Sequence, residues 1–368
     1  MSGGSIIALL GRQDSPTDAI EEYCLHLATG LQAHGLRLES VRVPWVEQGW
    51  AGTLRWLERA SAGWQGRWVL VQYTALSWSS RGFPVRFLAM MKDLKRHRAR
   101  VGVVFHDASP YEGARVVDVV RRAVQRRIMR RTAALADRTI LTVPLERATW
   151  LNSKGKAVFI PIGSNVPVCC AAQTTDRNPR EKTVVVFCGL TPGPSWSAER
   201  TALREAMQAA LQRFAAVHLV VFGRGSKESE PALRQAFEGM RVRLSVLGLL
   251  PAVEISRLLA SADAQLHVRG ELSTRRGSAI AGIAHGLPVV GYCGAETAPP
   301  ITDAGVCLVP VGDTQALGEA LVRVLTDAAF RDELRARSLS AYRQHFAWSA
   351  IAARYMHALE LRPSAEGP

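Results

Sequence analysis

The sequence lacks most of the features that mark membrane-spanning, disulfide-stabilised or metal-binding proteins. None of its 368 residues lie in a run approaching the roughly 18 apolar residues that a membrane-spanning helix needs. Its six cysteines form no CxxC pair and lie mostly in apolar segments, which favours buried thiols in a reducing compartment over disulfides or zinc ligands. No DxD-like pair is present to hold a metal ion. These absences predict a soluble, cytoplasmic chain with no metal or other cofactor.

Positive charge is abundant and unevenly spread. The net charge is +14, and residues 1–180 contain 26 Lys and Arg against 14 Asp and Glu, whereas the remainder contains 20 against 18. Two basic segments, 86–100 and 115–131, concentrate the excess. On a helical projection the second segment aligns four apolar side chains in one stripe: Val116, Val120, Val124 and Ile128. Such a helix either docks on an anionic membrane surface or packs its stripe into a core and exposes its arginines.

Apolar strands alternate with helical segments in both halves of the chain. The first half is expected to contain a helix over 18–35 and strands in the segments 6–11, 68–73, 100–106, 138–143 and 157–162. The second half is expected to contain strands in the segments 184–189, 218–223, 243–248, 264–268, 288–292 and 306–311. The polar stretch 171–183 is the predicted linker. The pattern predicts an α/β protein with two doubly wound domains, each built on a parallel sheet, and ligands at the carboxyl ends of the strands in a cleft between the domains.

Several motifs of the second half occur in an order that points to one enzyme family. These are VVFGRG (220–225), VLGLLPAVEISRLLASADAQLHV (246–268), GSAIAGIAHGLPVVGYCGAET (277–297) and GVCLVPVGD (305–313). In the first half, VQYTALSWSSRGFPVRFL (71–88), VGVVFHD (101–107) and FIPIGSNVP (159–167) fit the same family, as does the closing HFAWSAIAARYMHAL (345–359). With these motifs the chain resembles the retaining, bacterial GT-B glycosyltransferases of family 4.

The resemblance implies a domain plan and a reaction. Residues 1–168 would form a Rossmann-like acceptor-side domain and 169–345 a Rossmann-like donor-binding domain, and 346–368 a helix that crosses back to the first. The protein would transfer a sugar from a nucleotide-sugar donor to an acceptor hydroxyl, with retention. The donor's own phosphate would help to deprotonate the acceptor, so no dedicated protein base is required.

The segment STRRGS (273–278) is the predicted diphosphate site. A leaving nucleoside diphosphate gains negative charge, and without a metal that charge must be balanced by cations and by a helix N-terminus. Arg275 and Arg276 supply cations, Gly277 allows close approach of the backbone, and Ser278 adds an amide and a hydroxyl. The alternative is a pair of solvated arginines that cap a structural helix. Arg224 and Glu296 are further donor-binding candidates, since both follow strands of the donor domain.

The sequence departs from the family pattern at two carboxylates. The family commonly carries two glutamates eight positions apart, and aligning the Gly286–Pro288 turn puts Ser273 and Ala281 there. The basic pair that often follows the first donor-domain strand is also absent before Arg200. We therefore expect Arg275, Arg276 and Ser278 to take over part of the donor binding.

Candidate residues of the first domain follow its strands. His106 matches a family histidine that faces the donor sugar or the acceptor, and Asp107 either orients an acceptor hydroxyl or caps the next helix; both are named as catalytic candidates. Gly11, Tyr73 and Arg81 are acceptor-side candidates, although Tyr73 fits a core position equally well. His267 and His285 are interpreted as structural.

Two other classes of function remain open at this stage. One is a catalytically weakened GT-B module that acts as a binding partner of an active transferase, which the missing glutamates support. The other is a nucleic-acid-binding protein, suggested by the high pI of about 10.1. The basic segments lack interleaved aromatic residues and contain no nucleic-acid motif, so nucleic acid is not an expected partner. The expected partners are a nucleotide-sugar, an acceptor that is lipid-linked or a growing glycan, and an anionic membrane surface at the inner face of the membrane.

Overall fold

The computed structural model describes residues 5–113, 115–168, 181–187 and 196–362. The chain divides into two compact units: unit 1 is Met1–Ile162 with Trp348–Pro368, and unit 2 is Gly163–Ala347. Most of the predicted linker 171–183 lies outside the described residues, as do Cys169, Cys170 and Cys188.

Unit 1 is built on a parallel six-stranded sheet in the order β2-β1-β3-β4-β5-β6. Its strands are β1 (Ser5–Leu10), β2 (Arg37–Arg42), β3 (Trp68–Tyr73), β4 (Arg100–Phe105), β5 (Arg138–Leu141) and β6 (Ala157–Phe159). Its helices are α1 (Ala19–Gln32), α2 (Gly49–Ala60), α3 (Phe87–Arg96), α4 (Val116–Leu135) and α11 (Trp348–Ala358), with short 3-10 helices at Ser61–Gly63 and Leu145–Arg147.

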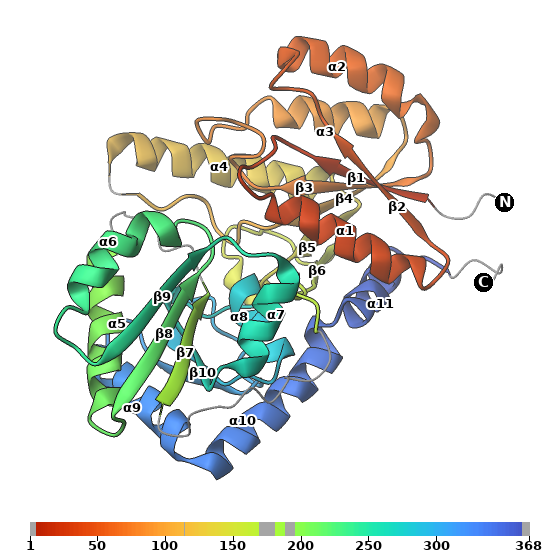
Figure 1. Ribbon diagram of the computed structural model, residues 1–368. Helices are drawn as coiled ribbons and strands as arrows, with labels where there is room; N and C mark the ends of the chain where they lie inside the picture. The colour runs from red at the N-terminus through yellow and green to blue at the C-terminus, as the bar shows by residue number, and fades with distance from the viewer. Residues whose placement is uncertain (1–4, 114, 169–180, 188–195, 363–368) are drawn as a thin grey trace. The chain divides into compact units, whose positions relative to one another are not determined.

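Helices cover both faces of the unit 1 sheet because successive strand residues point to opposite sides. In β1, Ile7 and Leu9 pack with α2, α3 and α4, whereas Ile6 and Leu10 pack with α1 and α11. Figure 1 shows α2, α3 and α4 together on one side of this sheet and α1 on the other. The hydroxyl groups of Tyr23 and Tyr355 lie 2.7 Å apart in the α1–α11 layer. The last helix therefore belongs to the core of unit 1.

Unit 2 repeats this plan with a parallel sheet in the order β12-β11-β10-β7-β8-β9. Its strands are β7 (Glu181–Phe187), β8 (Ala216–Phe222), β9 (Val242–Gly248), β10 (Ala264–Glu271), β11 (Val289–Cys293) and β12 (Val306–Pro310). Its helices are α5 (Trp196–Leu211), α6 (Ser226–Ala236), α7 (Ala252–Ser261), α8 (Gly277–Ala284), α9 (Thr314–Thr326) and α10 (Ala328–Ala341), followed by a π-helical turn at Tyr342–Phe346.

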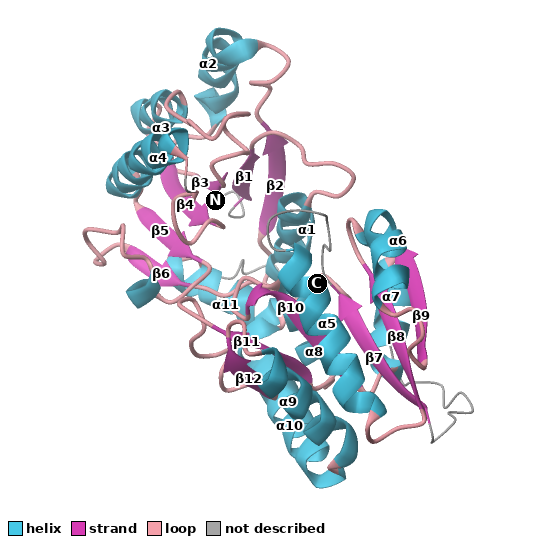
Figure 2. Cartoon of the chain, turned by 90° about the vertical axis from the view of Figure 1, so that its left-hand side faces the viewer, coloured by secondary structure: helices cyan, strands magenta, loops and turns pink. Residues whose placement is uncertain are grey.

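The two faces of the unit 2 sheet again bury alternating side chains. Val184 and Val186 of β7 pack with α5, α6 and α9, whereas Val185 packs with α7 and α8. Figure 2 shows the same sheet from a second direction. The predicted α/β class with two doubly wound domains is confirmed. The domain limits in the structure fall after Ile162 and Ala347, where the sequence placed them after 168 and 345.

The described residues contain no membrane-spanning helix, no candidate metal-binding group and no disulfide. Within them, no helix combines the length and apolar character that crossing a membrane would require. They also hold no group of three or more His, Cys, Asp or Glu side chains suited to a metal ion. Cys24 is buried, while Cys293 and Cys307 are half-buried, and all three are free thiols.

Candidate functional site

The strand order of unit 2 directs attention to the carboxyl ends of β7 and β10. The chain passes from β7 to β8 and β9 on one side and returns to β10 on the other, so the order reverses between β7 and β10. In doubly wound sheets ligands bind outside the carboxyl ends of strands at such a reversal. The turn of residues 272–276, which contains both predicted arginines, directly follows β10 and leads into α8.

The N-terminus of α8 is suited to an anion. Its N-cap residue Arg276 is non-helical, with φ −93° and ψ 86°, and its side chain provides no hydrogen bond to the first turn. Gly277 and Ser278, the first helical residues, are half-buried. The side-chain amide of Gln265 on β10 donates to the carbonyl of Ser278 over 3.0 Å, which ties the first turn of α8 to the sheet. First-turn amides and the helix dipole together favour negative charge here.

The two arginines of the turn have different environments. Arg275 donates from Nε to Oε2 of Glu296 over 2.6 Å and from Nη2 to Oε1 over 3.0 Å, which is a bidentate ion pair. Arg276 donates from Nε to the carbonyl of Glu271 over 3.2 Å and forms no ion pair among the described residues. Burial, and after it the charge of Arg275, lowers the pKa of the half-buried Arg276 guanidinium. The turn thus contains one arginine in a direct ion pair and one without, although Glu296 and Glu271 are close enough to Arg276 to favour its charge.

Three charged residues of this edge were not predicted from the sequence. Glu271 ends β10, and its Oε2 accepts the backbone N–H of Glu296 over 2.8 Å. Arg269, two residues earlier, lies 3.7 Å from a carboxylate oxygen of Glu199, a buried residue of the first turn of α5. Glu271 could have been predicted from its position directly before the predicted turn. Glu199 is far away in the sequence, and only the fold places it at this edge.

The other predicted residues of unit 2 are distributed around the same sheet. Arg224 lies in the loop after β8, between Gly223 and Gly225, which have φ values of 110° and 77°. His267 is buried on β10, with Nε2 3.1 Å from the carbonyl of Arg269, and His285 bonds through Nε2 to Ser256 and through Nδ1 to the carbonyl of Ala281. His285 is thus bonded through both ring nitrogens, whereas Nδ1 of His267 has no hydrogen-bond partner in the described part of the chain.

In unit 1 the order of strands reverses between β1 and β3, and several predicted residues lie at this point. Gly11 follows β1, and a Cβ on it would overlap the carbonyl of Ser77, so only glycine allows this approach. Asp107 follows β4, and its carboxylate accepts the backbone N–H of Ala75 over 2.7 Å. Both residues therefore contact the loop after β3. The next helix, α4, begins with Arg115 as its N-cap residue.

His106 is held by contacts on two sides. Its Nε2 lies 2.8 Å from Oε1 of the buried Gln72, and the ring of Tyr23 meets the imidazole edge-on with centroids 5.1 Å apart. Burial lowers the pKa of His106 to about 4, although the nearby Asp18 opposes the shift. The imidazole is therefore neutral at pH 7, and because Oε1 only accepts, Nε2 carries the proton and Nδ1 is an acceptor.

Tyr73 and Arg81 occupy contrasting positions. The Tyr73 ring is fully buried against Phe87 and Phe105, and its hydroxyl has no hydrogen-bond partner in the described part of the chain. Burial raises its pKa, so the phenol is neutral. Arg81 is exposed, and its carbonyl accepts from Nε of Arg121 on α4 over 3.1 Å. Tyr73 thus packs in the core, and Arg81 lies beside α4.

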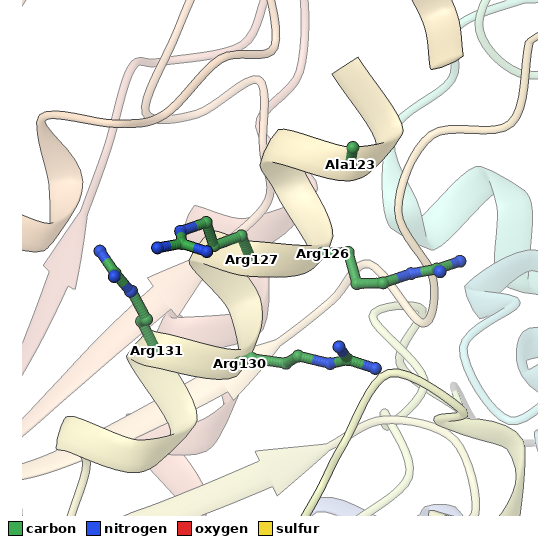
Figure 3. A pocket seen from close by; sticks show the side chains of 5 residues that line it. All are labelled: Ala123, Arg126, Arg127, Arg130 and Arg131. Carbon is green, nitrogen blue, oxygen red and sulfur yellow. The ribbon is translucent and has the colours of Figure 1, made fainter. Parts of the chain in front are cut away.

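The apolar stripe of α4 divides into an exposed and a buried half. Val116 is 83% exposed and Val120 52%, whereas Ile128 packs in the core at 3%. In the second half of the helix, Arg127 and Arg131 extend to one side and Arg126 and Arg130 to the other (Figure 3). These four arginines line a surface hollow with Ala123. None of the four pairs with a carboxylate within the described residues, and Arg130 donates from Nε to the carbonyl of Trp150 over 2.8 Å.

Comparison with known proteins gives a consistent picture. Residues 182–327 match the family model described as Glycosyl transferases group 1. That stretch contains the turn with both arginines. A phosphatidyl-myo-inositol mannosyltransferase of Mycobacterium leprae is 29% identical over 207 residues, covering 55% of this chain and 53% of the relative. The chain spans about half the length of the curated relatives it matches.

Solved structures share the fold over nearly the whole chain. Anabaena HepE in complex with UDP and glucose superposes with a TM-score of 0.68 at 14% identity, covering 97% of this chain and 99% of HepE. Sucrose-phosphate synthase of Thermosynechococcus elongatus gives 0.71 at 17% identity, with 97% and 98% covered. At these identities the likeness concerns the fold, which is GT-B with two Rossmann-like domains.

Proposed function

We propose that the protein is a glycosyltransferase of the family 4 type that transfers a sugar from a nucleotide-sugar donor to an acceptor hydroxyl. The observation that carries the proposal is the turn between β10 and α8, where a cation without a carboxylate partner adjoins an uncapped helix N-terminus. The turn lies at the strand-order reversal, inside the segment that matches the glycosyl transferases group 1 model. The mannosyltransferase relative and the UDP-bound HepE support the same reaction class.

In this proposal the donor's diphosphate binds at the turn. The phosphate oxygens would accept hydrogen bonds from the amides of Gly277 and Ser278 and from the guanidinium of Arg276. Arg275 would be a second cation, for which the diphosphate competes with Glu296. As the bond from the anomeric carbon to the phosphate oxygen breaks, its electron pair stays with the phosphate, and these groups offset the added charge. We infer that the chemistry requires no metal, so a chelator should leave the rate unchanged.

Retention follows if the acceptor attacks from the side on which the phosphate leaves. The acceptor oxygen then bonds to the anomeric carbon and its proton passes to a phosphate oxygen, which explains why no protein base is required. His106 would accept a hydrogen bond from a sugar hydroxyl through Nδ1, because Nε2 is engaged with Gln72. Asp107, anchored to Ala75, would fix the loop that borders the acceptor side with Gly11.

We further infer that the acceptor is reached at a membrane surface, with α4 as the docking element. Its first turns expose apolar side chains, including Val116 and Val120, and its second half carries arginines that pair with no described carboxylate. Exposed apolar side chains beside unpaired cations fit the boundary between acyl chains and anionic headgroups. A lipid-linked acceptor, or a glycan growing on a lipid, would be presented there, which makes the protein peripheral at the inner face of the membrane.

The weakened binding module remains a second candidate because of two particular side chains. Ser273 and Ala281 stand where the resemblance expects glutamates, and both are fully buried. Hydrolysis of candidate donors without acceptor discriminates between the two functions. An enzyme should release nucleoside diphosphate slowly from its own donor, whereas a binding module should release none.

The direct test is ligand binding at the turn. A thermal-shift screen with UDP, GDP, ADP and their sugars should identify the donor, since a ligand at 100 times its Kd adds about 2.7 kcal/mol of stability. Replacing both Arg275 and Arg276 with alanine should abolish detectable binding of that nucleoside diphosphate in calorimetry, with the melting temperature kept. Unchanged affinity in a folded double variant would contradict the proposed site.

A further inference from the structure

The ion pair between Arg275 and Glu296 occupies the Nε–Nη2 edge of the guanidinium, one of the edges through which it could bind a diphosphate. Both pairing distances, 2.6 and 3.0 Å, are those of a charge-assisted fork, and the two side chains are only 29% and 14% exposed. A carboxylate and a phosphate present similar pairs of oxygens to a guanidinium. Glu296 therefore holds Arg275 as a phosphate would hold it.

Neighbouring contacts fix Glu296 in that position. Its backbone N–H donates to Oε2 of Glu271 over 2.8 Å. The hydroxyl of the next residue, Thr297, donates to the carbonyl of Leu272 over 2.7 Å and accepts the N–H of Gly294 over 2.9 Å. A Cβ on Gly294 would overlap the Glu271 carboxylate, so the loop after β11 is packed tightly on the end of β10. The pair is thus supported by the fold and does not depend on two mobile side chains meeting at the surface.

Arg276 forms no direct ion pair among the described residues, although Glu296 and Glu271 favour its charge from nearby. It is half-buried, its Nε bonds a backbone carbonyl, and the guanidinium lies against Gly270, where an added Cβ would come within 3.1 Å of Nη2. Two adjacent cations in one turn therefore differ in how readily they can take an anion. Arg276 can take an anion without breaking an ion pair, whereas the Nε–Nη2 edge of Arg275 becomes available only if Glu296 is displaced.

We propose that Glu296 is an internal competitor for the diphosphate, which holds Arg275 until the ligand displaces it and recaptures Arg275 when the product leaves. The inference rests on the proposed donor site and concerns how the affinity of that site for diphosphate is regulated. Glu296 is then a positioning residue that lowers the affinity for nucleoside diphosphate and assists product release. Removing its charge should strengthen diphosphate binding, the opposite of what a simple ligand-contacting or structural residue would give.

The test is a double-variant cycle measured by calorimetry with inorganic pyrophosphate and UDP, both of which lack the transferred sugar. Glu296→Gln should bind at least one of these probes about ten-fold more tightly than the unaltered protein. Arg275→Gln should weaken binding only slightly, and the double variant should match Arg275→Gln, because the gain requires Arg275. Glu296→Asp, which is too short for the bidentate pair, should show a smaller gain and serves if the glutamine variant does not fold.

The control variant is Glu230→Gln, which removes a carboxylate of the same unit that pairs with Arg234 over 2.6 Å on α6. It should leave affinity unchanged. Weaker or equal binding by folded Glu296→Gln would overturn the inference, as would a gain that persists without Arg275, since that would reflect general repulsion of the anion. If the unaltered protein binds neither pyrophosphate nor any of UDP, GDP and ADP, the proposed donor site itself fails.

Discussion

Replacing His106 with alanine tests whether this histidine acts in sugar transfer or only stabilises the core of unit 1. For His106→Ala we expect turnover to fall about 100-fold or more, the scale of one lost transition-state hydrogen bond. Nucleoside diphosphate affinity should stay within about twofold, because the proposed diphosphate contacts all lie in unit 2. Turnover, calorimetric affinity and melting temperature should be measured on one preparation.

The structure also sets the stability cost of that change. Gln72 is 1% exposed, its Nε2 already lacks a described partner, and loss of His106 would leave Oε1 unpaired as well. An unpaired buried polar group costs about 1–3 kcal/mol. For a domain of this size, that corresponds to a decrease in melting temperature of roughly 2–4 °C per kcal/mol. A modest decrease is therefore expected even if the histidine acts in transfer.

Two further variants of His106 distinguish its ring nitrogens. Glutamine reaches the position of Nε2 and can keep the bond to Gln72, so His106→Gln should keep the melting temperature but not the turnover. Asparagine presents an oxygen near the position of Nδ1, so His106→Asn should retain more turnover than the glutamine variant despite lower stability. The reverse order, or full activity in a stable alanine variant, would refute the proposed acceptor role of Nδ1.

Two other predictions concern pH and membranes. Burial lowers the pKa of His106 and of His267 to about 4, below the value near 6.5 of a histidine in an unfolded chain. Between pH 6.5 and 4 the unfolded state therefore binds more protons than the folded state. The free energy of unfolding should fall as the pH drops over this range. Chemical denaturation over that range should show unit 2 losing up to roughly 3 kcal/mol through His267. His267→Gln should reduce the slope of the profile, and an unchanged slope would contradict this assignment. The protein should co-sediment with anionic vesicles at low salt and be released at high salt. Replacing Val116 and Val120 with serine should weaken that binding without changing the melting temperature, and equal recovery on neutral and anionic vesicles would rule out the docking role.

Most strands of both sheets were predictable because they contain buried residues that form continuous apolar runs. The strand that was missed, β2, has the sequence RLESVR at the edge of its sheet, where only Leu38 is buried. An edge strand with few buried positions leaves no apolar run to detect. The apolar stripe of α4 shows a different limit of sequence patterns. Its periodicity correctly predicted a helix, but it did not reveal that only the second half of the stripe, with Ile128, enters the core.

The candidate site could be predicted only where its residues are close in sequence. The turn with Arg275 and Arg276 was recognisable from its own residues. Their different environments were not, because the partner of Arg275 lies 21 positions away on the loop after the next strand. Glu199 belongs to a helix on another part of the sheet, and only the position of β7 beside β10 brings α5 to the same edge. Pairing across loops depends on strand order, which local patterns do not determine.

The two carboxylates next to the predicted arginines lie at the end of β10 and in the loop after β11, not on α8. Ala281 is fully buried and packs with Val185 and Leu259, so a glutamate there would place a carboxylate among apolar side chains. Glu271 and Glu296 instead stand at the ends of β10 and β11, each held by hydrogen bonds from the backbone or from Arg275. Introducing Ala281→Glu alone should therefore destabilise unit 2. In the proposed donor site these two carboxylates lie next to the two arginines, so the proposed exchange at Arg275 would set how tightly a diphosphate is held.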